Sequence, residues 1–364
     1  MKRAVAILSG LLLAGAAFAD VSVVERQGLT RRGLVRKIDA KKKHPRPVTR
    51  FGDQALTDAS GLEYFINSNI TLLTTSSASG AASEASYTGP VNADTSGGGT
   101  VSTTLTDAFD GYNAICVSTT GNTGPCSTGN AGVTIYNNNG AGTLDASCGG
   151  RQVILNAQTI GSLSVQRKIL VPSNDEFARF LDIVTNNGGG TQTVTLITSN
   201  NLGSDANTTI FGSSNGNTTA ELTDSWVATD GNFVGLDATD PRLGHVLQGP
   251  GARTPLASVN FPAGAAADLP TWAYTFSLAP GETKIIMNFV TGQPTRAEAR
   301  AKSAELAGLP TNALQCLSPA ETAQIVNFEA RGVTAIPTAS GFGLAALALL
   351  LAGASFFVLR RRTV

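Results

Sequence analysis

The feature that most constrains the fold is a series of short apolar segments with period-two patterning, separated by polar turns, in residues 151–292. In the clearest segment, residues 272–278, every second side chain is large and apolar. A strand places alternate side chains on one face, so this pattern is typical of a sheet packed against a core. Because the sequence shows no helical pattern between these segments, we predict an all-β fold, a large antiparallel β-sandwich.

Three pairs of segments are expected to form neighbouring strands. Each pair is joined by a short turn rich in Gly, Asn or Pro: 152–160 with 163–171, 177–184 with 191–198, and 272–278 with 284–290. Asn and Gly tolerate the positive φ of hairpin loops, so the turn at 186–190 in particular predicts a hairpin.

The sequence around this sandwich has a different composition. Residues 51–150 are rich in Ser, Thr and Gly, and within them 74–106 have no apolar period, which predicts loop, edge or spacer. Residues 293–335 predict a pair of short helices and a hinge. Thr295 caps the first helix and Ser318 the second. We expect both to pack against the edge of the sandwich.

The N-terminus has the three parts of a secretory signal peptide. A charged start is followed by an apolar region at 5–17, and Ala17 and Ala19 form an A-x-A cleavage site before Asp20. The apolar region is too short for a stable membrane anchor. We therefore predict removal of residues 1–19 and an exported protein.

The C-terminus predicts a single transmembrane helix. The apolar run 341–359 would form a helix of about 28 Å, close to the ~30 Å hydrocarbon core of a bilayer. Three arginines follow it: Arg360, Arg361 and Arg362. The positive-inside rule keeps them in the cytoplasm and leaves the preceding chain outside.

Residues 336–364 resemble the IPTL-CTERM protein-sorting signal, a relative of the PEP-CTERM signals of Gram-negative bacteria. The chain differs from the usual motif at Ala339 and Phe342, and it keeps Ile336, Pro337, Thr338, Ser340 and Gly343 before the span and the arginines. The resemblance implies processing by an exosortase-like membrane enzyme and delivery to the cell envelope or surface. A plain membrane anchor is the alternative.

Residues 20–50 form a basic arm. Ten basic and two acidic residues lie between positions 25 and 50, with few large apolar ones, which predicts disorder. An exported chain rarely meets nucleic acid, so we expect none as a partner. Anionic lipid or lipopolysaccharide is the expected partner of residues 26–50, and a solvated spacer is the alternative.

The four cysteines predict two disulfides. An even number in an exported chain favours disulfides over a metal site. Cys116 and Cys126 flank a turn-rich loop, which favours their pairing and leaves Cys148 for Cys316, although three connectivities are possible.

Few residues suggest chemistry. His245 is the only histidine beyond the basic arm, and it could act as a general base, although a structural role is commoner. Four aspartates on turns could bind calcium: Asp224, Asp230, Asp237 and Asp240. Turn-forming aspartates are the alternative. Aside from calcium, we expect no cofactor.

The segments 167–172, 202–205 and 240–246 resemble those of uncharacterised exported bacterial β-sandwich proteins, and this resemblance implies no activity. The sequence favours a non-enzymatic structural or adhesive protein of the cell envelope. The alternatives are a carbohydrate-binding module that stacks sugars on Trp226, Trp272 or Tyr274, and a hydrolase. Exposure of the tryptophans beside a groove would favour the binding module.

Overall fold

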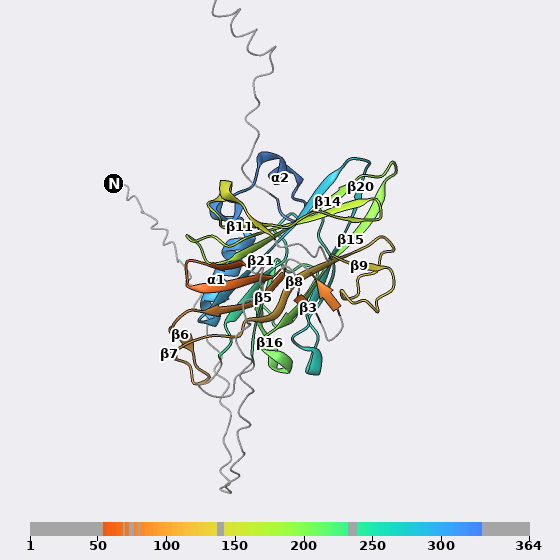
Figure 1. Ribbon diagram of the computed structural model, residues 1–364. Coiled ribbons are helices and arrows are strands. Elements are labelled where there is room, and N and C mark those ends of the chain that lie inside the picture. The colour runs from red at the N-terminus through yellow and green to blue at the C-terminus, as the bar shows by residue number, and fades with distance from the viewer. Residues whose placement is uncertain are drawn as a thin grey trace, which may run out of the picture. The chain divides into compact units, whose positions relative to one another are not determined.

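The computed structural model describes residues 54–329 except 68–69, 73–75, 79–80, 137–141 and 232–238. All of them lie in one compact unit, residues 46–364. Two large antiparallel sheets pack face to face in this unit, as predicted for a β-sandwich (Figure 1).

Among the described residues, eight strands form the first sheet. Their order is β1, β2, β5, β8, β15, β20, β19, and β9 also pairs with β8. The strands are β1 (Gln54–Thr57), β2 (Leu62–Asn67), β5 (Ala81–Tyr87), β8 (Phe109–Ser118), β9 (Val133–Ile135), β15 (Gln192–Leu202), β19 (Leu256–Asn260) and β20 (Thr271–Leu278).

The second sheet has nine strands in the described part of the chain. Their order is β10, β11, β13, β14, β21, β18, β17, β16, with β12 paired to β13. The strands are β10 (Thr143–Leu144), β11 (Gln152–Ile154), β12 (Gln158–Ile160), β13 (Leu163–Leu170), β14 (Ala178–Asn186), β16 (Thr208–Ser213), β17 (Trp226–Gly231), β18 (Arg242–Val246) and β21 (Thr283–Gln293).

Short ribbons and 3-10 turns complete the strand regions. The ribbons pair β3 (Ile70–Leu72) with β4 (Ser76–Ala78) and β6 (Val91–Asp94) with β7 (Thr100–Thr103). The 3-10 turns are Ala146–Cys148, Asp205–Asn207, Gly264–Ala266 and Thr311–Leu314.

The main core lies between the two large sheets. Alternate residues of β20, including Trp272 and Tyr274, point into it, as their period-two pattern predicts. Tyr112 of β8 meets Phe180 of β14 across the space, with ring centroids 5.8 Å apart. Side chains of both sheets therefore interdigitate in one apolar layer.

The predicted hairpin at residues 186–190 is wrong. β14 belongs to the second sheet and β15 to the first, so their connection crosses between the sheets. The turn from β20 to β21 crosses in the same way, and the amide of Gly281 donates to the carbonyl of Asn186 between the two crossings. An Asn- and Gly-rich turn permits a reversal of the chain, but pairing with distant strands decides the sheet. The predicted third pair, 272–278 with 284–290, is therefore wrong as well. In the first pair, residues 158–160 and 163–165 do form a hairpin around Gly161.

The region 51–150 is part of the same sandwich. β8 pairs with β15, so strands before and after residue 150 share the first sheet. The segment 74–106, predicted as loop, edge or spacer, contains the buried strand β5. Ala81, Ala82 and Ala85 fill its tight positions, and such small side chains give no strong periodic signal.

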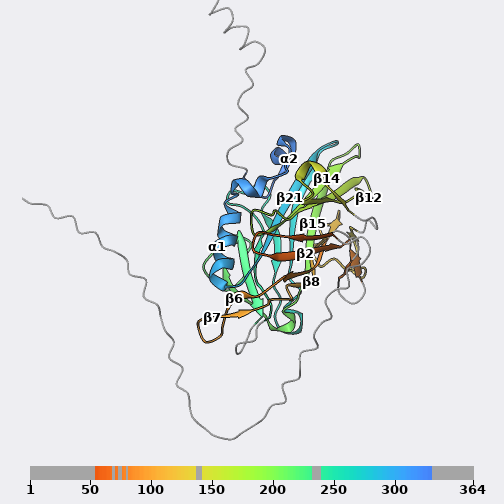
Figure 2. The ribbon, with the colours of Figure 1, turned by 60° about the vertical axis from the view of Figure 1, so that its left-hand side comes forward.

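The two helices are α1 (Arg296–Ala307) and α2 (Pro319–Gln324). Thr295 and Ser318 cap them as predicted. α1 packs on the outer face of β17, β18 and β21, and not at the edge of the sandwich as expected (Figure 2). Burial of Ala299, Ser303 and Leu306 explains this position.

The second helix ends at Gln324, and the chain after it is extended. Ile325 leaves α2 and bridges Ile285 of β21. The amide side chain of Asn327 then bonds both the N–H and the carbonyl of Met287, at 2.9 and 2.7 Å. These bonds between a side chain and the backbone of β21 hold the segment against the second sheet in an extended form.

The structure contains both predicted disulfides. Cys116 pairs with Cys126 and Cys148 with Cys316, at Cα separations of 5.5 and 5.6 Å. Disulfides form and persist in oxidising compartments, as expected of an exported chain.

The predicted signal peptide, basic arm and sorting signal, including the span 341–359, lie outside the described residues. Of the helices that are described, neither has the length and apolar character needed to cross a membrane.

Candidate functional site

The residues expected to stack sugars do not form a site. Trp272 and Tyr274 are buried between the sheets, with exposed fractions of 1% and 0%, so the prediction of sugar platforms is wrong for both. Their polar atoms are used internally, and Asn288 bonds both side chains. Trp226 is half-buried and packs against Phe211 and its apolar neighbours on the outer face of the second sheet.

His245 lies in the core and not in a cleft. Its Nδ1 hydrogen-bonds the Tyr112 hydroxyl at 2.9 Å, and its Nε2 hydrogen-bonds that of Thr229 at 2.8 Å. Burial lowers its pKa to about 3, so the ring is neutral at physiological pH. A buried imidazole that bonds two hydroxyl groups has a structural role. The hypothesis that His245 acts as a general base is therefore wrong.

The aspartates proposed for calcium are separated by their partners. Asp224 accepts the backbone N–H groups of Asn215 and Glu221 in a turn. Asp230 pairs with Arg296 of α1 at 2.6 Å. Asp237 lies outside the described residues, and within them no three His, Cys, Asp or Glu side chains gather as metal ligands.

Beside α1, the structure has a pocket of about 580 Å³ that these predictions did not include. It lies where four segments meet: the β1–β2 turn, the ends of β5 and β6, the β13–β14 loop, and the chain from Gln293 at the end of β21 into α1. Its lining residues are Ala59, Ser60, Tyr87, Val91, Asn174, Asp175, Glu176, Gln293, Pro294, Glu298, Ala301, Lys302 and Glu305.

Local sequence shapes the β1–β2 side of the pocket. The Asp58 carboxylate accepts the N–H groups of Ser60 and Leu62, at 2.9 and 3.1 Å, which is a typical Asx-type turn. Gly61 follows with φ +90°, a conformation that suits glycine. The N–H of Ala59 then donates to the carbonyl of Asp175, which ties this turn to the β13–β14 loop.

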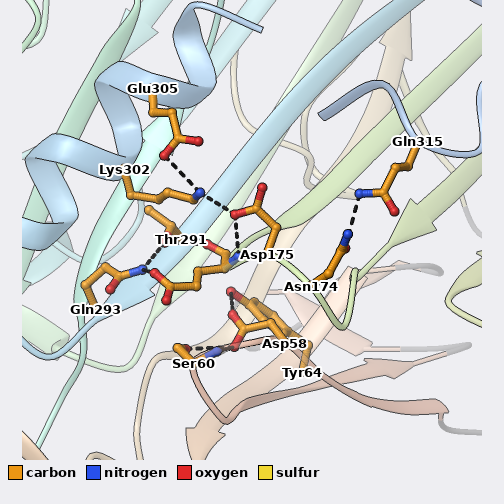
Figure 3. A network of polar contacts seen from close by, with 11 residues as sticks. Asp58, Ser60, Tyr64, Asn174, Asp175, Thr291, Gln293, Lys302, Glu305 and Gln315 are labelled. Carbon is orange, nitrogen blue, oxygen red and sulfur yellow. Dashed lines mark hydrogen bonds and ion pairs between the residues drawn. The ribbon is translucent and has the colours of Figure 1, made fainter. Parts of the chain in front are cut away.

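α1 supplies the opposite wall. Glu298, Lys302 and Glu305 follow one another at i, i+4 and i+7, so they share one face of the helix. Lys302 bonds Asp175 of the β13–β14 loop and lies 3.0 Å from Glu305 (Figure 3). Burial alone would lower the pKa of Lys302, but its bonds to the two carboxylates raise it above the ordinary value. Lys302 is therefore a fixed positive charge.

The β13–β14 loop is also fixed from β21. Gln293 donates to the Glu176 carboxylate at 3.1 Å, and Thr291 donates to the Glu176 carbonyl at 2.7 Å. Figure 3 shows the labelled members of this network around the loop. The wall is thus held by hydrogen bonds from two elements, which is the preorganisation that a binding site needs.

Asp58 is buried and directly precedes Ala59 and Ser60, two residues that line the pocket. Burial raises its pKa to about 6, although hydrogen bonds from Ser60 and Leu62 oppose the shift, and the charge of Glu176 raises it a little further. The charge of Glu176 therefore acts on the buried Asp58 carboxyl group.

The pocket can bind a polar ligand through many hydrogen bonds. Carboxylate, amide, ammonium and hydroxyl groups converge on it, with small apolar surfaces from Val91, Pro294 and Ala301 between them. Sequence reasoning missed the site because its walls come from distant segments. The one local signal was the charged i, i+4, i+7 face of α1.

Comparisons with known proteins give little further guidance. No family model matches the sequence, and no curated protein matches it. Among solved structures, a polysaccharide lyase is similar over 66% of this chain and 34% of its own, with 12% identity and a TM-score of 0.36. A protein described as a kojibiose phosphorylase from the human microbiome is similar over 73% of this chain and 33% of its own, with 11% identity and a TM-score of 0.40.

A protein described as an aldose 1-epimerase from Escherichia coli K12 is similar over 66% of this chain and 98% of its own. Its identity is 10% and its TM-score 0.33. These three proteins are enzymes by their descriptions, and we therefore withdraw the prediction of a non-enzymatic protein. The similarity is too low to assign any of their activities or substrates to this chain, which spans about a third of the first two.

Proposed function

We propose that the protein is an exported cell-envelope protein whose sandwich binds carbohydrate in the pocket beside α1. Carbohydrate binding at the cell surface would give it an adhesive role.

The observation that carries this proposal is the composition of the pocket. Its volume lies in the range of small-ligand sites, about 300–1,000 Å³, and its polar side chains are held in place by their own network. A sugar presents many hydroxyl groups on a compact ring. Carboxylates and amides such as Glu176 and Gln293 can accept from or donate to these groups, and Val91 and Pro294 can contact the apolar ring face.

A glycan array followed by isothermal titration calorimetry tests the binding. We expect the oxidised protein to bind a defined glycan, and Ala301→Trp to abolish binding because the indole would fill the pocket from α1. Ala304→Trp is the matched control, since Ala304 is exposed on the same helix outside the pocket lining. Mass spectrometry of the bound glycan would show turnover in the same experiment.

Two outcomes contradict the proposal. In the first, the array detects no glycan. In the second, Ala301→Trp binds as well as the wild type while both variants keep their melting temperature.

Delivery to the envelope is a separate part of the proposal, and it is supported by the sequence at both ends. If an exosortase-like enzyme processes the tail, the mature chain should end near Thr338 and lack the span 341–359. Pro337→Ala should then accumulate an uncleaved form in the inner membrane, with Arg360–Arg362 in the cytoplasm. Intact-mass measurement decides this, and a mature chain that keeps residues 341–364 would show a plain anchor.

The basic arm provides the proposed contact with anionic lipid or lipopolysaccharide. Vesicle binding should weaken steeply from low to physiological salt. Deletion of residues 25–50 should remove it and leave the melting temperature nearly unchanged. Equal binding by the deleted form would assign residues 26–50 to a spacer.

A further inference from the structure

The pocket has more negative than positive side chains. Among the described residues, four carboxylates line it, from Asp175, Glu176, Glu298 and Glu305, and Lys302 is the single lining cation. Lys302 bonds both Asp175 and Glu305, so its charge is already matched within the wall. A ligand in this pocket therefore meets a negative surface.

The other two carboxylates have neutral partners. Glu176 accepts from the Gln293 amide, and Glu298 accepts from the Thr295 hydroxyl at 2.6 Å. Across the described part of the chain, neither forms an ion pair within 4.0 Å. Glu298 is exposed and Glu176 half-buried, so both can be reached from the pocket.

The raised pKa of Tyr87 agrees with a negative potential in the pocket. Burial is the main cause of the raised pKa of Tyr87, and the carboxylates of Asp58, Glu176 and Glu298 raise it further. Tyr87 lines the pocket, so these carboxylates act on a group in the pocket wall.

We infer that the preferred ligand is a sugar with an ammonium group, an amino sugar, bound through Glu176 and Glu298. An ammonium donates charge-assisted hydrogen bonds to carboxylates, and these are about twice as strong as neutral ones. A uronic acid would instead place a like charge against the same two groups. This inference rests on the proposed carbohydrate binding.

A series of sugars that differ mainly in charge tests the inference. Titrations at about pH 6.5 with glucosamine, glucose and glucuronate keep the pyranose ring and change its charge from positive to negative. We expect glucosamine to bind about tenfold more tightly than glucose, which is about 1.4 kcal/mol, and glucuronate to bind more weakly than glucose.

Glu176→Gln should reduce the ratio of glucosamine affinity to glucose affinity severalfold, because it removes a negative charge that favours only the ammonium sugar. Glu221→Gln is the control, because Glu221 is an exposed carboxylate in a loop outside the pocket lining, and the ratio should stay the same. Added salt should weaken the binding of glucosamine more than the binding of glucose.

The outcomes separate the two proposals. If glucose binds as tightly as glucosamine, or if Glu176→Gln leaves the ratio unchanged, the charge inference is overturned while carbohydrate binding stands. If none of the three sugars binds and the array detects no glycan, both are overturned.

Discussion

The space between the sheets and the pocket beside α1 both contain ionisable side chains, but their charges are balanced differently. Between the sheets, Arg167 and Asp182 are fully buried and lie 2.6 Å apart. At the pocket, Glu176 and Glu298 keep contact with solvent and accept from neutral groups. A buried charge must be satisfied by the protein itself, whereas a charge at the pocket stays available to a ligand.

The largest expected effect contrasts one ion pair from each region. Asp182→Ala would leave Arg167 buried without its carboxylate, at a cost of about 3–5 kcal/mol in unfolding free energy. Asp175→Ala should cost less, about 1.5–3 kcal/mol, because Lys302 keeps its second carboxylate partner, Glu305. Urea unfolding of the two variants measures both costs, and equal values would remove the distinction between the regions.

The next effect concerns Glu84 of β5, which is buried and accepts the N–H of Ala108 at 3.1 Å. Burial, with a smaller contribution from Asp107, raises its pKa from 4.5 to about 9. The folded protein then holds this proton more tightly than the unfolded chain. Its contribution to stability is complete below pH 4.5 and declines up to pH 9, with about 3 kcal/mol lost by pH 7.

Glu84→Gln keeps an uncharged side chain and should flatten this part of the pH profile. Thermal or urea unfolding between about pH 5 and 8 measures it. Glu221→Gln serves as the control, because Glu221 is exposed in a loop and makes the same change of side chain away from β5. If Glu84→Gln leaves the pH profile unchanged, other groups of the folded protein compensate for the charge of Glu84.

A smaller effect is expected for His245, the residue that looked most like a catalyst. His245→Phe would leave the hydroxyl groups of Tyr112 and Thr229 unpaired in the core, at a cost of about 1–3 kcal/mol. Because the folded pKa is lowered to about 3, wild-type His245 favours folding above pH 6.5 and loses this contribution toward pH 3. The variant should therefore also be less sensitive to acid.

Glycan binding by His245→Phe should equal that of the wild type, because His245 is fully buried and does not line the pocket. A selective loss of binding or turnover in a folded variant would show that His245 contributes to the site.

Local patterns predicted what local interactions control. The caps of α1 and α2 and the inward face of β20 depend on residues a few positions apart, and the structure has them as expected. The crossing at residues 187–191 depends instead on the pairing of β14 with β21, about a hundred residues away. A turn sequence contains no information about that partner.

The pocket has the same non-local origin. Ser60, Glu176 and Lys302 are far apart in the sequence, and each resembles an ordinary turn or surface residue there. Trp272 and His245 were conspicuous because their types are rare in this chain, yet the apolar core accounts for both. Residue type suggested chemistry, but exposure decides which residues can meet a ligand, and exposure follows from the fold.

The smallest expected effect is a change in the pKa of Asp58, the buried carboxyl group next to the pocket lining. Its value of about 6 reflects burial, which raises it, and the hydrogen bonds of Ser60 and Leu62, which lower it. Ser60→Ala removes one stabilising donor from the carboxylate, so the pKa should rise. Glu176→Gln removes a nearby negative charge, so the pKa should fall. Carboxyl chemical shifts followed by NMR through an acid titration report both pKa changes, which must have opposite signs. If the pKa falls in both variants, or does not respond to Glu176→Gln, the charge of Glu176 does not act on Asp58.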